Sequence, residues 1–201
     1  MPEVAVSVTD AALAATAATS KVLDATSKLQ SKSAECGELT NFKKVCEFHQ
    51  SFGVKHTENP QIDIFDKDPK TMKLRLDLIR EEFKELEQAA GEKNMTEVLD
   101  ALSDILYVTY GAGSSLGLDL DKAFALVHDS NMSKLCKTQE EAEATIEWYK
   151  ANKTGPEGKY PYDSPAWRKS GDYFVVYNES SGKVLKSINY KPVSFKSMLP
   201  N

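Results

Sequence analysis

Two long helical segments joined by a four-residue turn constrain this fold more than any other feature of the chain. The first is predicted to run from Pro69 to Ala90 and the second from Met95 to Tyr110, with the sequence GEKN between them. Proline suits the first turn of a helix and glycine suits its end, so these boundaries agree with the spacing of the apolar residues. Because the connection is short, we expect the two helices to be antiparallel neighbours.

The first of these helices carries acidic residues within its apolar face. At about 100° per residue, that face consists of Leu78, Ile79, Phe83, Leu86, Ala89 and Ala90. Glu82 falls inside the face, Glu85 lies on its edge, and Glu81 lies further round. A carboxylate in apolar surroundings is unfavourable unless a cation or hydrogen bonds compensate its charge.

The second helix repeats the pattern in the stretch EVLDALSDILYV, residues 97–108. Glu97, Asp100 and Asp104 interrupt an otherwise apolar coat, and residues 95–111 contain no Lys or Arg. Carboxylates that converge from two neighbouring helices repel one another and raise their own pKa values. An oxygen-preferring divalent cation removes that conflict, and Mg²⁺ in particular also binds substrate phosphates. The alternative is that these acids form ordinary ion pairs with Arg75, Arg80 or Lys84 on a solvated face.

A later helix carries a second polar exception. Asn131 lies among the apolar residues of that helix, and Lys134 flanks it. One interpretation is that Asn131 is buried and that its amide is hydrogen bonded within the protein, as buried amides normally are. The other is that the amide and the cation together bind a phosphate or a base.

The rest of the chain predicts one helical core with appendages. We expect a flexible or weakly helical leader over 1–40, an all-α core over 41–136, and a C-terminal extension over 137–201. Further helices are predicted from Asn41 to Gly53, from a cap at Asp119 or Asp121 to Leu135, and from Thr138 to about Lys150. Loops are predicted over 54–68 and 151–170, with GAGSSLGLDL as a turn, a hairpin around Ser-Ser-Gly in YFVVYNESSGKVLKS, and an irregular tail.

Composition excludes several classes of partner. The chain has 201 residues and a net charge of −5, which argues against a surface for nucleic acid or an anionic membrane. Its three cysteines show no paired spacing, so we expect a reduced, cytoplasmic compartment without a disulfide framework. No targeting signal and no membrane span are expected from the pattern of charged and apolar residues.

The ordered series of motifs resembles the MazG-type all-α nucleotide pyrophosphohydrolases. The similarity is strongest to the branch that resembles phosphoribosyl-ATP pyrophosphohydrolase and covers about residues 42–192, with 137–172 as an extra segment. The stretches that carry it are EFHQSFG, LRLDLIREEFKELEQA, DALSDILYVTYGAGSSLGLDLDKAF, VHDSNMSKL and a late G-K-x-x-K followed by proline. The resemblance implies an all-α, MazG-like helical bundle, here with a short C-terminal β-hairpin.

The family pattern, E-E-x-x-E followed by E-x-x-D, implies roles for the acids. Glu82, Glu85 and Asp104 match metal ligands, and Glu81 matches the base that activates water. The family's second-helix glutamate falls on Ala101, which cannot bind a metal, so either Asp100 or Glu97 would take its place. The candidate substrate-binding residues are Asn131, Lys134, Arg75, Lys183 and Lys186.

The resemblance therefore implies a nucleoside triphosphate pyrophosphohydrolase that uses Mg²⁺, with Mn²⁺ as a substitute. Such an enzyme would release pyrophosphate and a monophosphate from a nucleotide, as in house-cleaning of dUTP, dCTP or non-standard nucleotides. It would also be a homodimer or homotetramer with sites built partly across subunits. Two alternatives are a phosphoribosyl-ATP pyrophosphohydrolase of histidine biosynthesis and a non-catalytic nucleotide-binding relative, for which Ala101 is the main argument.

Overall fold

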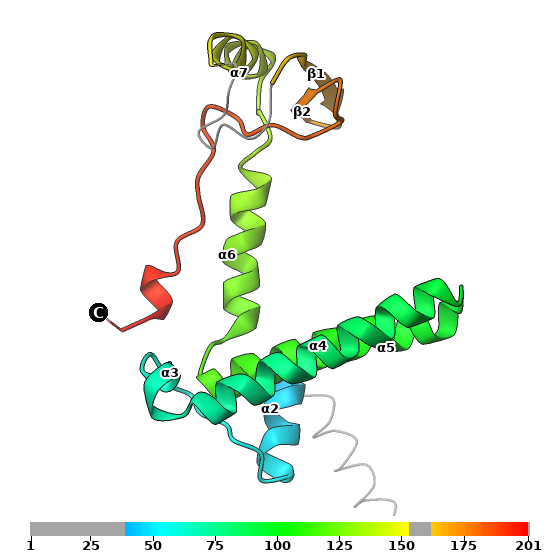
Figure 1. Ribbon diagram of the computed structural model, residues 1–201. Helices are drawn as coiled ribbons and strands as arrows, with labels where there is room; N and C mark the ends of the chain where they lie inside the picture. The colour runs from blue at the N-terminus through cyan, green and yellow to red at the C-terminus, as the bar shows by residue number, and fades with distance from the viewer. Residues whose placement is uncertain (1–38, 153–161, 201) are drawn as a thin grey trace, which may run out of the picture.

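The computed structural model describes residues 39–152 and 162–200, so the expected leader lies almost wholly outside the described residues. Three parts follow one another in space (Figure 1). A pair of long helices with a short helix across it forms the first part, a single helix forms a stalk, and a small module of helix and hairpin stands at the far end of that stalk. The predicted all-α bundle with a C-terminal hairpin is confirmed.

The predicted pair of antiparallel helices is present as α4, Pro69–Gly91, and α5, Met95–Leu116. The Asp68 side chain caps α4 by accepting from the backbone N–H of Thr71 at 3.1 Å. Asn94 caps α5 in the same way, accepting from the amides of its first turn. Because only three residues, 92–94, connect the helices, the turn is tight and Lys93 takes a left-handed conformation with φ 57°.

Helix α5 is six residues longer than predicted, because the glycine- and serine-rich stretch after Tyr110 continues the helix instead of forming a turn. Small residues here allow close packing: Gly113 leaves so little room that a Cβ would lie 2.6 Å from Leu120 Cγ. The helix ends at Gly117, whose φ of 70° suits a glycine. Carbonyls at the end of α5 accept hydrogen bonds from the loop between α2 and α3. One of these bonds runs from the Gln61 backbone amide to Leu116 O at 2.9 Å.

Helix α2, Asn41–Ser51, crosses α5 and matches the first predicted helix. Val45 and His49 are its buried residues. The following segment was predicted as a loop throughout, but it contains one helical turn, α3, Ile64–Lys67. The burial of Ile64, 3 % exposed, explains why this turn is ordered.

The stalk is α6, Leu120–Met132, and Asp119 is its cap, accepting from the Lys122 amide at 3.1 Å. The helix ends three residues before the predicted Leu135. It ends there because Cys136 leaves the helical path and exchanges two backbone hydrogen bonds of 2.9 Å with Phe174 of the hairpin.

The C-terminal module consists of α7, Gln139–Ala151, and the antiparallel strands β1, Pro165–Ser170, and β2, Tyr173–Asn178. Thr138 caps α7 as predicted. The chain does reverse around Ser-Ser-Gly as predicted, since Tyr177 and Val184 form an antiparallel bridge across it. The strand that pairs with β2 over its whole length is β1, however, which was assigned to a loop and is joined to β2 by a turn at Gly171-Asp172. The module has a core of its own, made by Cys136, Ala142, Tyr149, Val176 and Leu185.

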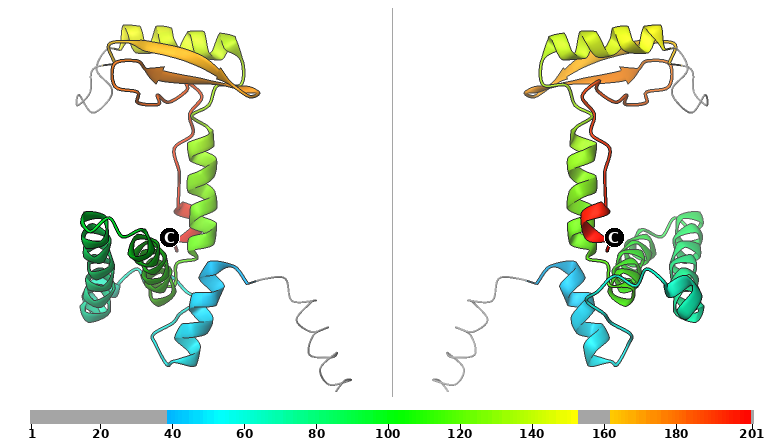
Figure 2. Two further views of the ribbon diagram at one scale, coloured as in Figure 1. Left: turned by 90° about the vertical axis from the view of Figure 1, so that its right-hand side faces the viewer. Right: turned by 90° about the vertical axis from the view of Figure 1, so that its left-hand side faces the viewer.

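The chain after the hairpin returns beside α6 (Figure 2). Ser130 Oγ donates to the Lys191 carbonyl at 2.9 Å, which attaches the tail to the stalk. The tail is irregular as expected, apart from a single turn of 3₁₀ helix, η1, Lys196–Met198. Within the described ranges, no helix combines the length and apolar character that crossing a bilayer requires.

Candidate functional site

The acids of α4 and α5 lie close enough to influence one another. Partial burial raises the pKa of Glu82, and the negative charges of Glu85, Asp104, Glu81 and Asp100 raise it further. Two of these four neighbours come from α5, so acids of the two helices lie within electrostatic range of each other. We call Glu81, Glu82, Glu85, Asp100 and Asp104 the acidic cluster.

No Lys or Arg among the described residues forms an ion pair with a member of this cluster. Arg80 was one predicted partner, but its guanidinium binds Asp77 at 2.8 Å on another side of α4. A partly buried carboxylate with four acidic neighbours and no cation is destabilised by its surroundings. The cluster therefore has the charge and the oxygen donors that suit a divalent cation.

The two candidates for the missing family glutamate differ in position along α5. Asp100 precedes Asp104 by one turn, about 6 Å along the axis, whereas Glu97 precedes it by two turns, about 10 Å. Asp100 is among the charges that act on Glu82, and Glu97 is not. Ala101 itself is 3 % exposed, so that position lies on the buried face of α5.

The side chains of the acidic cluster do not surround one common point. In the parts of the chain that the structure describes, no three His, Cys, Asp or Glu side chains are arranged to hold a single metal ion. Apart from Glu82, the cluster is solvent exposed, so its side chains are free to change rotamer. Binding of a cation would therefore require rearrangement of these side chains.

Arg75, a predicted substrate-binding residue, lies in the interior where α2 meets α4 and α5. It is 6 % exposed, and burial lowers the pKa of its guanidinium. A Cβ on Gly111 would lie 3.5 Å from Arg75 Nη1 and 3.2 Å from His49 Nε2, so the three residues adjoin. Arg75 does not pair with Glu82, which was one prediction: the guanidinium points to His49 and Gly111 instead.

The other predicted substrate-binding residues lie at the opposite end of the stalk. Asn131 and Lys134 are at the end of α6, and Lys134 Nζ donates to Asn131 Oδ1 at 2.7 Å. Lys186 Nζ lies 4.6 Å from the Tyr190 ring centre, and Lys183 Nζ lies 6.0 Å from that of Tyr162. Within one chain these residues are separated from α4 and α5 by the length of the stalk (Figures 1 and 2).

An aromatic patch beside the acidic cluster was not predicted. Phe48 and Phe52 of α2 stack with ring centres 4.3 Å apart, and the Tyr107 ring meets Phe48 edge-on at 5.7 Å. Tyr107 follows Asp104 by one helical turn. The spacing of four residues between Phe48 and Phe52 on one helix was the signal that could have found this patch.

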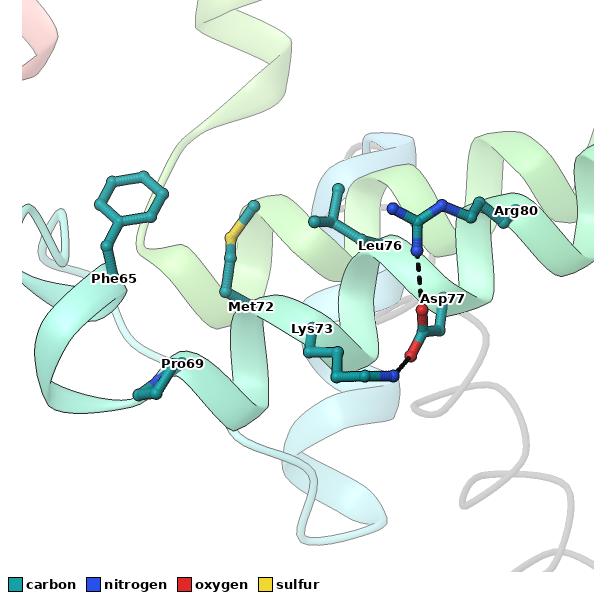
Figure 3. A pocket seen from close by; sticks show the side chains of 7 residues that line it. All are labelled: Phe65, Pro69, Met72, Lys73, Leu76, Asp77 and Arg80. Atoms are coloured by element: carbon teal, nitrogen blue, oxygen red, sulfur yellow. Dashed lines mark hydrogen bonds and ion pairs between the residues drawn. The ribbon is translucent and has the colours of Figure 1, made fainter.

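A shallow groove of about 460 Å³ lies on the other side of α4, next to α3. Figure 3 shows its apolar floor of Phe65, Met72 and Leu76, with Asp77 on the rim between Lys73 and Arg80. Counted around the helix, this rim lies opposite Glu82. The groove therefore belongs to a different surface from the acidic cluster.

A helical pair with facing acids and a short helix across one end is the arrangement expected of the all-α nucleotide pyrophosphohydrolase-like class. The family model of phosphoribosyl-ATP pyrophosphohydrolase matches residues 45–131, which include α4, α5 and most of α2 and α6. The chain is also 30 % identical to the Uncharacterized protein L479 of Acanthamoeba polyphaga mimivirus, over 81 % of this chain and 96 % of that protein. The chain belongs to the phosphoribosyl-ATP pyrophosphohydrolase-like branch of the MazG-type superfamily.

Proposed function

We propose that this protein hydrolyses nucleoside triphosphates to a monophosphate and pyrophosphate with the help of Mg²⁺, or of Mn²⁺ in its place. The observation that carries the proposal is the position of Glu82, whose pKa is raised by partial burial and by four acidic neighbours on two helices. Such an arrangement is unfavourable for stability, and it is most simply explained by a ligand that carries positive charge.

In this proposal, Glu82, Glu85, Asp104 and Asp100 hold the cation through their carboxylate oxygens. A bound Mg²⁺ would neutralise the charge of the substrate phosphates. Glu81 lies on the exposed edge of the cluster, where its carboxylate can accept a proton from a water molecule. The water oxygen then bonds to the α-phosphorus, the bond from that phosphorus to the bridging oxygen breaks, and pyrophosphate leaves.

We further propose that a second copy of the chain completes the site. Among the described residues no Lys or Arg forms an ion pair with the acidic cluster, although the phosphates of a nucleotide carry several negative charges. Asn131, Lys134, Lys183 and Lys186 are on or near the surface at the far end of the stalk. A homodimer or homotetramer could place these residues of one copy beside the acids of another.

The exposed surface of α5 supports this assembly. Leu99, Leu102 and Leu106 are 66 %, 46 % and 58 % exposed and lie on the side of α5 away from Asp104. A continuous apolar stripe of this kind on a helix is typical of an interface between proteins. The apolar coat that the sequence predicted for burial is thus available to a second copy.

The test is a screen of ribonucleoside and deoxyribonucleoside triphosphates for pyrophosphate release at saturating Mg²⁺. We expect turnover with at least one nucleotide and its loss on chelation. Glu82→Gln should reduce the rate by more than the roughly 10–100-fold that is typical of changes around a metal's ligands. Glu87→Gln, an exposed acid on α4 outside the cluster, is the matched control and should keep full activity. Full activity of Glu82→Gln would refute the proposal.

Phosphoribosyl-ATP is a second candidate substrate, because the matching family model carries that name. The same preparation assayed with phosphoribosyl-ATP and with the triphosphates separates the two activities by their ratio. Nucleotide binding without turnover of either substrate would instead identify a non-catalytic relative.

A further inference from the structure

We propose that the aromatic patch of Phe48, Phe52 and Tyr107 is the surface on which the base of the substrate nucleotide stacks. The inference rests on the proposed function, because it assigns the base of the nucleotide whose phosphates the acidic cluster would bind. It names the class of ligand as a nucleotide with a planar heteroaromatic base.

The first argument is the exposure of the patch. Phe52 is 72 % exposed, although aromatic side chains usually bury most of their surface, and Tyr107 and Phe48 keep 41 % and 38 % of theirs exposed. The rings are nevertheless ordered against each other, since Phe48 contacts both of the others. A preformed, exposed group of rings offers a flat face to a ligand at little cost in side-chain entropy.

The second argument is the position of the patch relative to the acids. On α5, Asp100, Asp104, Tyr107 and Gly111 lie along one stripe. Residues three apart on a helix have Cβ atoms about 5–6 Å apart, so the Tyr107 side chain adjoins that of Asp104. In a nucleotide the sugar joins the base to the α-phosphate, so a base on the patch would have its phosphates beside the acids of the same stripe.

The third argument is the polar end of the patch. His49 follows Phe48, and their ring centres are 6.3 Å apart. His49 Nδ1 and Arg75 Nε are the buried side-chain atoms without a hydrogen-bond partner in the described part of the protein. Buried polar atoms normally have partners. A base carries hydrogen-bonding groups on its edge, whereas an apolar side chain from a second copy carries none.

The experiment measures binding of α,β-methylene analogues of ATP, GTP, CTP and UTP to the full chain with Mg²⁺, and of inorganic tripolyphosphate as a ligand without a base. Phe52→Leu and Tyr107→Leu should weaken binding of the tightest analogue at least about fivefold, which is about 1 kcal/mol. Both variants should leave tripolyphosphate binding unchanged. Phe52→Tyr, which keeps an aromatic ring, should bind nucleotide as the unmodified protein does. The matched control is Phe65→Leu, because Phe65 is 66 % exposed and lies on the other side of α4.

Equal weakening of tripolyphosphate and nucleotide would overturn the inference, as would unchanged nucleotide binding or no binding of any analogue. A change of oligomeric state in Phe52→Leu with nucleotide binding intact would assign the patch to a contact between subunits. The experiment distinguishes failure of the proposed hydrolysis from failure of the proposed stacking. Binding that depends on Phe52 without turnover refutes hydrolysis alone, and turnover with a KM independent of Phe52 and Tyr107 refutes stacking alone.

Discussion

His49 and Arg75 are neighbours in the interior, where a Cβ on Gly111 would lie 3.2 Å from His49 Nε2 and 3.5 Å from Arg75 Nη1. Burial lowers the pKa of His49, and the positive charge of Arg75 lowers it further. The imidazole is therefore held neutral beside a buried guanidinium.

The pair predicts a loss of stability in mild acid. Since the pKa of His49 is lower in the folded protein than its ordinary value of 6.5, the unfolded chain binds the proton more readily. Stability should therefore be fully present above about pH 6.5 and fall as the pH decreases toward the folded pKa. Urea unfolding at pH 8 and at pH 5.5 measures the difference, and His49→Gln should make it smaller. His128→Gln, an exposed histidine on α6, serves as the control. An unchanged pH dependence in His49→Gln would contradict the prediction.

The mutual repulsion of the acids in the acidic cluster predicts that Glu82→Gln stabilises the metal-free protein. The pKa of Glu82 is raised by burial and by neighbouring acids, so its contribution to stability is lost as the pH rises through the ordinary value of 4.5 to the folded value. At pH 7, removal of its charge should raise stability by less than about 1 kcal/mol, because the side chain is still partly exposed.

Thermal unfolding with and without Mg²⁺ tests both parts of that prediction. Added Mg²⁺ should raise the Tm of the unmodified protein and have a smaller effect on Glu82→Gln. Glu87→Gln should behave like the unmodified protein in both conditions. A Glu82→Gln protein that is less stable than the unmodified one without metal would argue against charge repulsion at this position.

The end of α5 predicts that Gly117 is indispensable for the packing of the preceding loop. A Cβ at Gly117 would lie 2.0 Å from Asn59 O, and its φ is +70°. Gly53 has a similar φ of +66° but open space around it. Gly53→Ala should therefore cost about 1–2 kcal/mol for the left-handed conformation alone, and Gly117→Ala should cost at least about 1 kcal/mol more because of the overlap. Chemical denaturation of both variants measures the difference, and equal losses would show that the loop yields without penalty.

The leucine stripe of α5 predicts the assembly state. Light scattering should show a dimer or a tetramer, and Leu102→Glu combined with Leu106→Glu should shift it toward the monomer. The charges would be buried without partners in the assembly, which is strongly unfavourable. Phe124→Glu, at a 70 % exposed position on α6, is the control and should leave the assembly unchanged. A double variant that assembles normally would exclude this stripe as the interface.

The periodicity of α4 and α5 predicted more of this protein than any other feature, because apolar spacing, caps and a short turn are local properties. Pro69, Asp119 and Thr138 take the positions at helix starts that their chemistry favours. The same local logic failed after Tyr110. Its small residues look like a turn in isolation, but they continue the helix because His49, Leu120 and the loop before α3 pack closely against them.

The same distinction between local pattern and tertiary packing applies to the candidate site. The sequence by itself determined which acids lie on one stripe of each helix, since residue spacing decides which side chains of a helix share a face. Only the tertiary structure decided that Arg75 turns inward to His49, that Asp100 rather than Glu97 acts on Glu82, and that Phe48 of α2 meets Tyr107 of α5. These relationships depend on how separate helices cross, which is fixed by packing between residues distant in the chain and not by the pattern within any one segment.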